Sequence, residues 1–556
     1  MDTSVSISFG LVDVTAKQDT TAALPDRKAF IDPQDLSLEG VYAPKVATLE
    51  RNYFKLDGSF RLFPENPEDF TWGIWSESMT GDDGRFTTPP VLTLTFQELH
   101  EAIGLTFEFD PYGNNYCNDL LIRWYHGADM ILENAFQPNN WRFSCQETVQ
   151  NYNKIEITFY GTVRPHRYLK VQNIMHGMNK MFDRGSLKTA SLLEEIDLSG
   201  LTVSSNALEF TVYSEDDDFN IFNPKGVYTL LQKKQQLTVE GTQDGIVKHL
   251  GTFYLEDMEM EGDKLLSISA QDGIGIMDGT NYKGGIYRAK PAHELLKEIM
   301  DNAGFGYTLD SSLRNVPVTG YLPICSHREA LQHLAFAIGG YVTTARSGTV
   351  NIVAFPDWSN IPTVSIGRDR KFIGTKVKMR SLVTGVNVKA HEYSLSDTAE
   401  ELCKVTLAEG RNEILFSEPA AEISIDVGTL VESGVNYCIV EGTADTVCTV
   451  SGKKYVDTEK TVTVKMAELP AGDKENNVDA DSTLLNSANA KSAAQRLFDY
   501  YQYRIEQDIS FVMKEETVGL LADIETEYGV YRGSVVESMD TDLTGGFVTK
   551  AVTVGE

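Results

Sequence analysis

Cysteine is scarce in this sequence and is not arranged for bridging or for metal binding. The six cysteines among 556 residues form no CxxC pair and no repeated spacing; they are Cys117, Cys145, Cys325, Cys403, Cys438 and Cys448. A chain of this length can bury its cores without a framework of disulfides. We therefore expect free, buried thiols in a reducing compartment.

The sequence also lacks segments that would direct it into a membrane. The N-terminal residues MDTSVSISFGLVDV contain no basic region followed by an apolar core, which a signal peptide needs. No run of about 18 apolar residues is present, the length that a spanning helix requires. We expect a soluble protein with no membrane span, made in a cytoplasm.

Positive charge is in short supply. The chain has 49 lysines and arginines against 80 aspartates and glutamates, a formal net charge of −31. Binding to a phosphate backbone needs clustered lysine and arginine. The composition therefore predicts no specific nucleic-acid binding, although it says little about the fold.

Motifs that mark nucleotide and calcium sites are incomplete. In residues 273–279 the third glycine stands one position too late for a dinucleotide loop, and residues 280–285 cannot continue as a helix. The acidic run at residues 215–218 lacks the alternating ligands and the glycine that let a loop wrap calcium. We interpret this run as a solvated turn.

Catalytic and metal-binding motifs are missing as well. The His-Glu pairs at 293–294 and 391–392 lack a second histidine four residues after the first, which would put two imidazoles on one helix face. His327 and His333 are expected to be partly buried, satisfied side chains, and there is no GxSxG elbow. A carboxylate pair for glycoside cleavage has no local spacing signature, so the sequence leaves that reaction open. We predict no enzymatic activity, no cofactor and no metal site.

The clearest helix signal begins after Lys290. Pro291 suits the first helical position, where its missing N–H costs nothing. Apolar residues then recur at three- and four-residue spacing as far as Gly304, which supplies a left-handed stop. The spacing predicts one amphipathic helix.

A second helix is predicted shortly afterwards. Ser326 and Glu329 form a capping box, in which each side chain satisfies a backbone N–H of the other residue. The apolar stripe that follows ends at Gly339-Gly340, and residues 341–353 are typical of a hairpin with a Ser-Gly turn. On periodicity alone this pattern suits any small α/β module.

Most of the remaining chain is strand-like. Residues 91–96, 105–109, 120–125 and 155–160 are apolar or aromatic segments separated by proline, glycine and asparagine turns. Many short strands at this spacing predict a β-sandwich or jelly roll. Strand patterns return in later parts of the chain, and residues 487–501 have the apolar spacing of another helix.

The N-terminal strands resemble a known family. FTWGIWS, CNDLLIRWY and NYNKIEITFYGTVRPHRYLKVQNI follow one another in the order seen in galactose-binding-like (discoidin-type) jelly rolls of tail proteins from phages of Gram-positive bacteria. This similarity covers about a quarter of the chain. It implies a carbohydrate-binding-like domain.

Aromatic residues of this segment are the candidate ligand site, because indole and phenol faces can stack on sugar rings. Trp141 is the best candidate for an exposed ring, and its companions are Asn139, Asn140, Arg142 and Tyr125. Trp72, Trp75 and Trp124 stand beside apolar strand residues and are expected in the core. Even for Trp141, a core position without a ligand is the favoured interpretation.

The rest of the chain resembles the hub of a phage-tail baseplate. A strand ending in an acidic turn is followed by strands carrying LTVEG and LGTFYLED, then by the two-helix module, and finally by a helix and an LTGG-type hairpin. Hub proteins of this kind share an architecture with spike-hub proteins of type VI secretion. The similarity spans roughly residues 200–556 and depends on the order of elements.

These patterns together predict a mainly β fold with small α/β parts: a jelly-roll β-sandwich followed by hub-type β-barrels and a small α/β module. The expected domains are an N-terminal arm (1–44), a jelly roll (45–175), a linker (176–199), a first hub barrel (200–285), the α/β module (286–355), a β-rich hub domain (356–480), and a helix with a returning barrel half (481–556).

The resemblance implies a function in the virion. Hub proteins act as homotrimers at the tail tip or baseplate, joining the distal tail protein, tail tube and tape-measure protein to the tip, spike or receptor-binding proteins, after assembly in the host cytoplasm. If acidic side chains line the axial channel, they repel DNA phosphates during ejection. The alternative is a host-receptor protein whose jelly roll binds cell-surface glycan.

Overall fold

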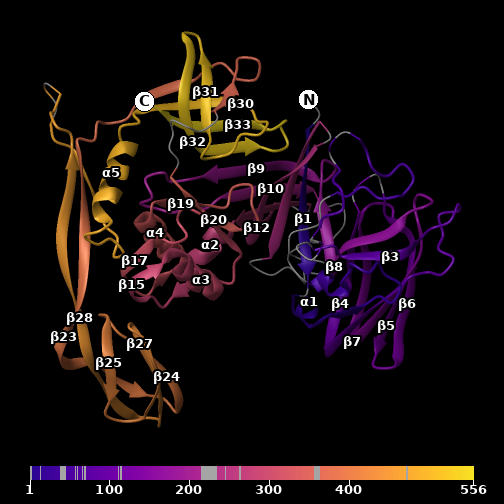
Figure 1. The fold of residues 1–556 in the computed structure, drawn as a ribbon, viewed down its shortest axis with the longest axis horizontal. Helices are drawn as coiled ribbons and strands as arrows, with labels where there is room; N and C mark the ends of the chain where they lie inside the picture. Colours follow the sequence, from indigo (N-terminus) through magenta and orange to yellow (C-terminus); the bar gives the residue numbers. More distant parts are fainter. Residues whose placement is uncertain are drawn as a thin grey trace. The chain divides into compact units, whose positions relative to one another are not determined.

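The computed structural model describes residues 3–12, 14–37, 45–56, 58, 60–65, 67, 71–110, 112, 115–213, 235–244, 246–261, 264–355, 363–470, 472 and 474–555. The chain is mainly β with a few short helices, as the sequence predicts (Figure 1). None of the helices in this part of the chain has the length and hydrophobicity to cross a bilayer. All six cysteines are free, and four of them are buried.

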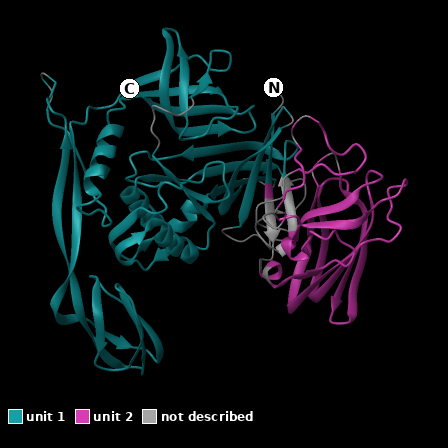
Figure 2. Ribbon diagram, viewed as in Figure 1, with its two compact units in different colours: residues 1–7, 182–556 teal, residues 8–181 magenta. Residues whose placement is uncertain are grey.

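Residues 8–181 form one compact unit, the N-terminal unit, and residues 1–7 with 182–556 form a second, the C-terminal unit (Figure 2). Strand β1 (Thr3–Val12) spans the boundary. The N-terminal unit contains α1 (Val14–Asp19), β2 (Thr21–Ala23), the 3-10 helix η1 (Pro33–Ser37), β3 (Ile74–Met79), β4 (Val91–Phe109), β5 (Cys117–His126), β6 (Asp129–Phe136), β7 (Arg142–Thr162) and β8 (Tyr168–Phe182).

Antiparallel pairing in the N-terminal unit centres on two long strands. β4 pairs with β7 along most of its length, β7 pairs with β5, and β5 pairs with β6. The second half of β4 also pairs with β8, which pairs with β3. Alternate side chains of these strands enclose one core that includes Phe107, Trp124 and Tyr152. The jelly-roll topology within this antiparallel fold stays a prediction.

Part of the predicted N-terminal arm belongs to this unit. β2 pairs with β4 in the register Thr21↔Thr95, and Ala22 and Leu24 are buried in the same core. The arm was predicted from mixed polar sequence, but these apolar residues are enough to hold the segment against β4.

The main sheet of the C-terminal unit is assembled from both ends of its sequence. Its strands are β9 (Leu187–Glu195), β10 (Ala207–Tyr213), β11 (Gln236–Gln243), β12 (Ile246–Glu261), β13 (Leu265–Gln271), β21 (Thr363–Ile366), β22 (Lys376–Met379), β30 (Ile505–Val512), β31 (Leu521–Thr526), β32 (Gly529–Asp542) and β33 (Val548–Gly555). Their order is β11-β12-β13-β10-β9-β32-β33-β30-β22, with β31 and β21 continuing from β32.

Strand β9 corrects the predicted linker at residues 176–199. Its residues Leu187, Ala190 and Leu192 are buried, and it pairs with β10 on one side and β32 on the other. The alternation of apolar and polar residues along this segment is typical of a strand with one buried face. β9 thereby joins the predicted first barrel and the returning half into one sheet.

The two predicted helices and the predicted hairpin are present in the α/β module, which also includes elements between residues 273 and 285. It comprises α2 (Gly273–Asp278), β14 (Asn281–Tyr282), β15 (Gly285–Pro291), α3 (Ala292–Ala303), β16 (Tyr307–Leu309), β17 (Pro317–Leu322), β18 (Cys325–Ser326), α4 (His327–Ile338), β19 (Gly340–Thr343) and β20 (Val350–Ala354). β19 and β20 form the predicted antiparallel hairpin. Pro291 is the N-cap of α3 and not its first residue.

Local signals fix both helices of the module. The Glu329 N–H donates to the Ser326 hydroxyl over 3.1 Å, and the Ser326 N–H donates to the Glu329 carboxylate over 2.9 Å, so the capping box is confirmed. Gly304 and Gly339 end the helices with φ of 75° and 88°, a left-handed conformation that favours glycine. The apolar stripes of both helices are buried in one core.

A long hairpin extends from this module (Figure 1). β23 (Gly385–Leu407) pairs with β28 (Thr446–Lys465) along its length, β29 (Asn477–Ala480) lies parallel to the start of β23, and α5 (Ala490–Tyr500) packs on the root of the hairpin. The distal end carries β24 (Gly410–Leu415), β25 (Ala420–Ile425), β26 (Thr429–Ser433) and β27 (Tyr437–Gly442) around a small core of their own.

The capping box gives the first testable prediction. Ser326→Ala removes the acceptor for the Glu329 N–H, and we expect it to lower the stability of α4 by about 1 kcal/mol. Amide hydrogen exchange of α4 would measure the loss. Ser433→Ala, at an exposed position of β26, should change stability by less than about 0.5 kcal/mol. Equal exchange in both variants would contradict the role of the cap.

Candidate functional site

Four of the five candidate glycan residues are consecutive and lie at the start of β7. Asn139 and Asn140 are exposed, but Trp141 is half-buried and packs against the core. The Arg142 guanidinium lies 4.9 Å from the centre of the Trp141 ring and 2.8 Å from Glu108. Arg142 is therefore already engaged by two neighbours, and the glycan site stays a prediction.

The fifth candidate, Tyr125, is not brought to this group. Tyr125 pairs with Lys154 in the second half of β7, whereas Arg142 begins that strand. The Tyr125 hydroxyl donates to Glu156 over 2.8 Å, and the Lys154 ammonium lies 4.1 Å above the Tyr125 ring. The pairing of β5 with β7 places this residue beside the middle of β7, away from Arg142, and sequence order could not reveal this.

The other tryptophans of the N-terminal unit are core residues or pack against the core, as expected. Trp72 and Trp124 are 4% and 1% exposed, and Trp75 packs on the same core. The cavity beside Trp72 and Trp75 has a volume of about 30 Å³. That space suits a water molecule and not a sugar ring.

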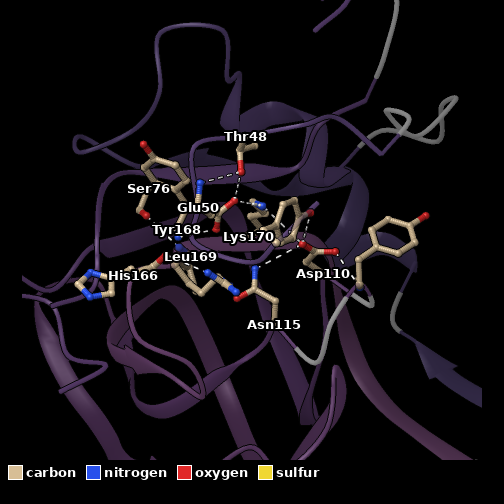
Figure 3. A network of polar contacts seen from close by, with 12 residues as sticks. Thr48, Glu50, Ser76, Asp110, Asn115, His166, Tyr168, Leu169 and Lys170 are labelled. Atoms are coloured by element: carbon tan, nitrogen blue, oxygen red, sulfur yellow. Dashed lines mark hydrogen bonds and ion pairs between the residues drawn. The ribbon is translucent and has the colours of Figure 1, made fainter. Parts of the chain in front are cut away.

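A buried charge network lies against this cavity (Figure 3). The Lys170 ammonium is 2.6 Å from Glu50 and 3.5 Å from Asp110, and all three residues are at most 3% exposed. Glu50 also accepts hydrogen bonds from the Thr48 hydroxyl and the Tyr168 N–H. Because its charged groups pair with one another, the network fastens residues 45–53 to β8.

A hollow lies on one face of the main sheet of the C-terminal unit. It has a volume of about 580 Å³ and is lined by residues of β9, β10, β12, β13, β32 and β33. Its exposed acidic side chains, here called the acidic face, are Glu209, Asp257, Glu259, Asp540 and Asp542. Lys550 is the one basic residue that lines it.

Cross-strand register explains why these carboxylates gather. Glu209 lies opposite Ser191 on β9 and Ser269 on β13, and Ser269 in turn lies opposite Asp257 on β12. Asp542 lies opposite Ser191 from the other side. Since successive side chains alternate between the faces of a sheet, all of these residues project to one side.

Between the carboxylates the face carries small hydroxyl groups. Thr189, Ser191, Thr211, Ser267 and Ser269 line the same hollow, and the Thr211 and Ser267 hydroxyls are 3.1 Å apart. The opposite face of these strands is apolar, with Phe210 and Ile268 in the core. The hollow is thus open and acidic, which suits a hydrated surface better than a catalytic pocket.

The sequence contains a pattern of alternating polar residues that indicates this face. The tripeptides EFT at 209–211, DME at 257–259, SIS at 267–269 and DTD at 540–542 all place polar residues on either side of one central residue. That alternation marks a strand with one polar face. Only the pairing of β10, β12, β13 and β32 shows that the polar residues of all four strands lie on one face of the sheet.

The incomplete nucleotide-loop motif at residues 273–279 has a structural role. Residues 273–278 form the short helix α2, and the Asp272 carboxylate caps it by accepting from the Gly275 N–H over 3.0 Å. Asp272 is 1% exposed, and burial raises the pKa of its carboxyl above the ordinary value. The acidic run at 215–218 lies outside the described residues.

The two histidines of α4 are satisfied, partly buried residues, as expected. His327 contacts the Thr280 hydroxyl and the Asn302 side chain, each over 2.9 Å. His333 contacts the Ser482 hydroxyl over 2.8 Å. Burial lowers the pKa of both imidazoles, so their neutral forms are favoured.

One group of described side chains combines the residue types that bind metal ions. His391, Asp457 and Glu459 each offer a ligand atom, and these atoms lie within 4.8 Å of one another. His391 is on β23, whereas Asp457 and Glu459 are on β28. The sequence search for a second histidine on the same helix face could not detect ligands supplied by a neighbouring strand.

Comparison with known proteins gave no matching family model and no matching curated protein. Solved structures do match. A 43 kDa tail protein of prophage MuSo2 from Shewanella oneidensis is 10% identical at a TM-score of 0.40, covering 67% of this chain and 94% of that one. A tail protein from Neisseria meningitidis MC58 is 10% identical at a TM-score of 0.42, covering 68% and 94%.

A further match covers a smaller part of the chain. The family 32 CBM from C. perfringens NanJ, solved in complex with galactose, is 12% identical at a TM-score of 0.19. It covers 32% of this chain and 99% of that one. The solved structures that this chain resembles thus include phage tail proteins and one carbohydrate-binding module.

The buried charge network supplies a prediction about stability. Lys170→Met leaves Glu50 and Asp110 buried without their cation, and we expect the free energy of unfolding to fall by about 3–5 kcal/mol. Lys154→Met is the matched control, because Lys154 pairs with Glu156 at the surface and should cost no more than about 1 kcal/mol. Denaturant unfolding of the full chain would measure both; equal losses would refute the structural role of Lys170.

Proposed function

We propose that this chain is the structural hub of a phage, or phage-derived, tail tip or baseplate. In this proposal three copies surround the tail axis and join the tail tube, distal tail protein and tape-measure protein to the tip, spike or receptor-binding proteins. The protein works in the virion, after assembly in a host cytoplasm, and has no enzymatic activity. The observation that carries the proposal is the acidic face.

A channel for DNA needs a wall that does not bind phosphate. The acidic face has five exposed carboxylates and one lysine, spread over strands from both halves of the C-terminal unit. Carboxylates repel phosphate oxygens across a distance of about 10 Å at 0.1 M salt. A sheet that turns this face toward the axis would let DNA pass without adhesion.

The edge of the same sheet supports assembly from several copies. Among the described strands β22 pairs only with β30, and all four of its residues are exposed. Val377 and Met379 are each 63% exposed, and the nearby Ile373 is completely exposed. Lys376 and Lys378 make up the other half of this strand. Because exposed apolar side chains gathered at an unpaired strand edge are typical of an interaction site, we propose that a second copy covers β22.

The first prediction from this proposal concerns oligomeric state. Sedimentation of the purified full chain should give three times the mass of the 61.8 kDa monomer. Val377→Glu places a charge on the β22 edge and should shift the protein toward monomer. Val431→Glu, on the exposed strand β26, is the matched control and should leave the trimer intact. A wild-type monomer at micromolar concentration would refute the proposal.

The second prediction concerns the acidic face. Neutralising Glu209, Asp257, Glu259 and Asp540 to their amides should leave assembly intact and slow DNA release from particles, because the wall no longer repels phosphate. The control neutralises four exposed glutamates of the long hairpin and its distal end: Glu400, Glu401, Glu413 and Glu432. DNA release at the wild-type rate from the acidic-face variant would show that this face does not line the channel.

A further inference from the structure

The root of the long hairpin contains a group of charged side chains that the tail-hub role does not use. His391 of β23 lies directly opposite Glu459 of β28, and Tyr393 lies opposite Asp457. The His391 side chain is 3% exposed, whereas Asp457 and Glu459 are 27% and 50% exposed. The cluster is therefore anchored inside the hairpin and opens to solvent on one side.

The imidazole of His391 is held between two carboxylates. Its Nδ1 is 2.6 Å from the Asp457 carboxylate, and its Nε2 is 2.7 Å from the Asp481 carboxylate. A neutral imidazole has one N–H, so it can donate to only one of them. The other nitrogen then faces a carboxylate with its lone pair, and that contact requires a cation.

Asp481 is placed to be the partner that receives the N–H. The preceding residue, Ala480, pairs with Val388 of β23, and the His391 N–H of the backbone donates to the Leu485 carbonyl over 2.8 Å. These contacts fix the loop that carries Asp481 against the ring. A carboxylate on the far nitrogen orients a histidine and raises its basicity in many metal sites.

We propose that His391 Nδ1, Asp457 and Glu459 bind a divalent transition-metal ion of the zinc class, with Asp481 as the positioning residue. Their ligand atoms already lie within 4.8 Å of one another, and one nitrogen with two carboxylates leaves a fourth position for water. The metal supplies the cation that the Asp457–His391–Asp481 arrangement lacks. It fastens β23 to β28 at the point where the hairpin leaves the module.

Charge balance favours a dication at this point. Asp457, Glu459 and Asp481 supply three negative charges against one positive charge from Lys389, whose ammonium is 2.9 Å from Glu459 and 3.7 Å from Asp481. Lys389 is a competitor, because Glu459 must turn from it to reach the metal. Its side chain is 46% exposed, so it can swing into water.

A proton is the other competitor for Nδ1. Burial opposes protonation of His391, but the carboxylates of Asp481 and Asp457 outweigh burial and raise the pKa of the imidazole above its ordinary value. His333 of α4, the Tyr393 hydroxyl and Glu329 are the further titratable groups near this cluster. A proton and a metal ion cannot occupy Nδ1 together, so the two compete for this nitrogen.

Metals are first removed from the full chain with EDTA. Zn²⁺ is then titrated into the protein, and calorimetry at neutral pH measures its binding. We expect one ion per chain and a higher melting temperature that EDTA reverses. His391→Gln and Asp457→Asn should abolish binding. Asp301→Asn is the matched control, because it breaks the exposed Lys297–Asp301 pair with the same change of charge and should leave Zn²⁺ binding unchanged.

Two further variants keep the test decisive if a ligand variant fails to fold. Lys389→Met removes the competing ammonium and should tighten Zn²⁺ binding several-fold. Asp481→Asn should weaken it by about 10- to 100-fold and shift the pH profile of binding, since the orienting carboxylate is lost. The visible spectrum of bound Co²⁺ should change in Asp481→Asn and stay unchanged in Asp301→Asn.

Three outcomes would overturn the proposal. Absence of Zn²⁺ binding, or binding that His391→Gln leaves unchanged, would refute the site. The proposal would also be refuted if NMR showed that the His391 ring is protonated at neutral pH and stays protonated in excess Zn²⁺. In that case the cation between the two carboxylates is a proton.

Discussion

The pairing of β9 with β32 is the constraint on which the C-terminal unit depends. It joins residues 191–195 to residues 538–542, so strands from opposite ends of the unit's sequence share one sheet. Without it, β10 to β13 and β30 to β33 would be two separate sheets with open edges. Closing so long a loop is entropically costly, and the continuous burial of Leu192, Val536 and Met539 beneath these strands offsets that cost.

The same pairing creates the surface features of the unit. Asp540 and Asp542 come from β32, while Glu209, Asp257 and Glu259 come from β10 and β12; one register brings them to one hollow. Mutual repulsion of these carboxylates opposes folding, and the serines and threonines between them keep the groups apart and hydrated.

The α/β module plays a different part. Its helices and the first residues of the long hairpin share one core with α5, so β23 and β28 leave the module from a rigid base. The His391 cluster lies just beyond that core, where apolar packing gives way to charged residues on the hairpin. A cross-strand fastening at this point would set the direction of the hairpin and of the small distal core that it carries.

The sequence by itself determined the elements whose causes are local. The Ser326–Glu329 capping box, the left-handed glycines at 304 and 339, the apolar stripes of α3 and α4, and the mainly β character all follow from residues within a few positions of one another. The buried positions of Trp72 and Trp124 followed from their apolar strand neighbours in the same way.

What only the tertiary structure decided depends on which strands become neighbours. The linker at 176–199 contains a central strand, because Leu192 is buried between β10 and β32, and β32 lies more than 300 residues further along the chain. Tyr125 is separated from Trp141 by strand pairing, and His391 gains Asp457 and Glu459 across a hairpin. Strand register is set by contacts between residues far apart in the sequence. The spacing of residues within one segment therefore cannot predict it.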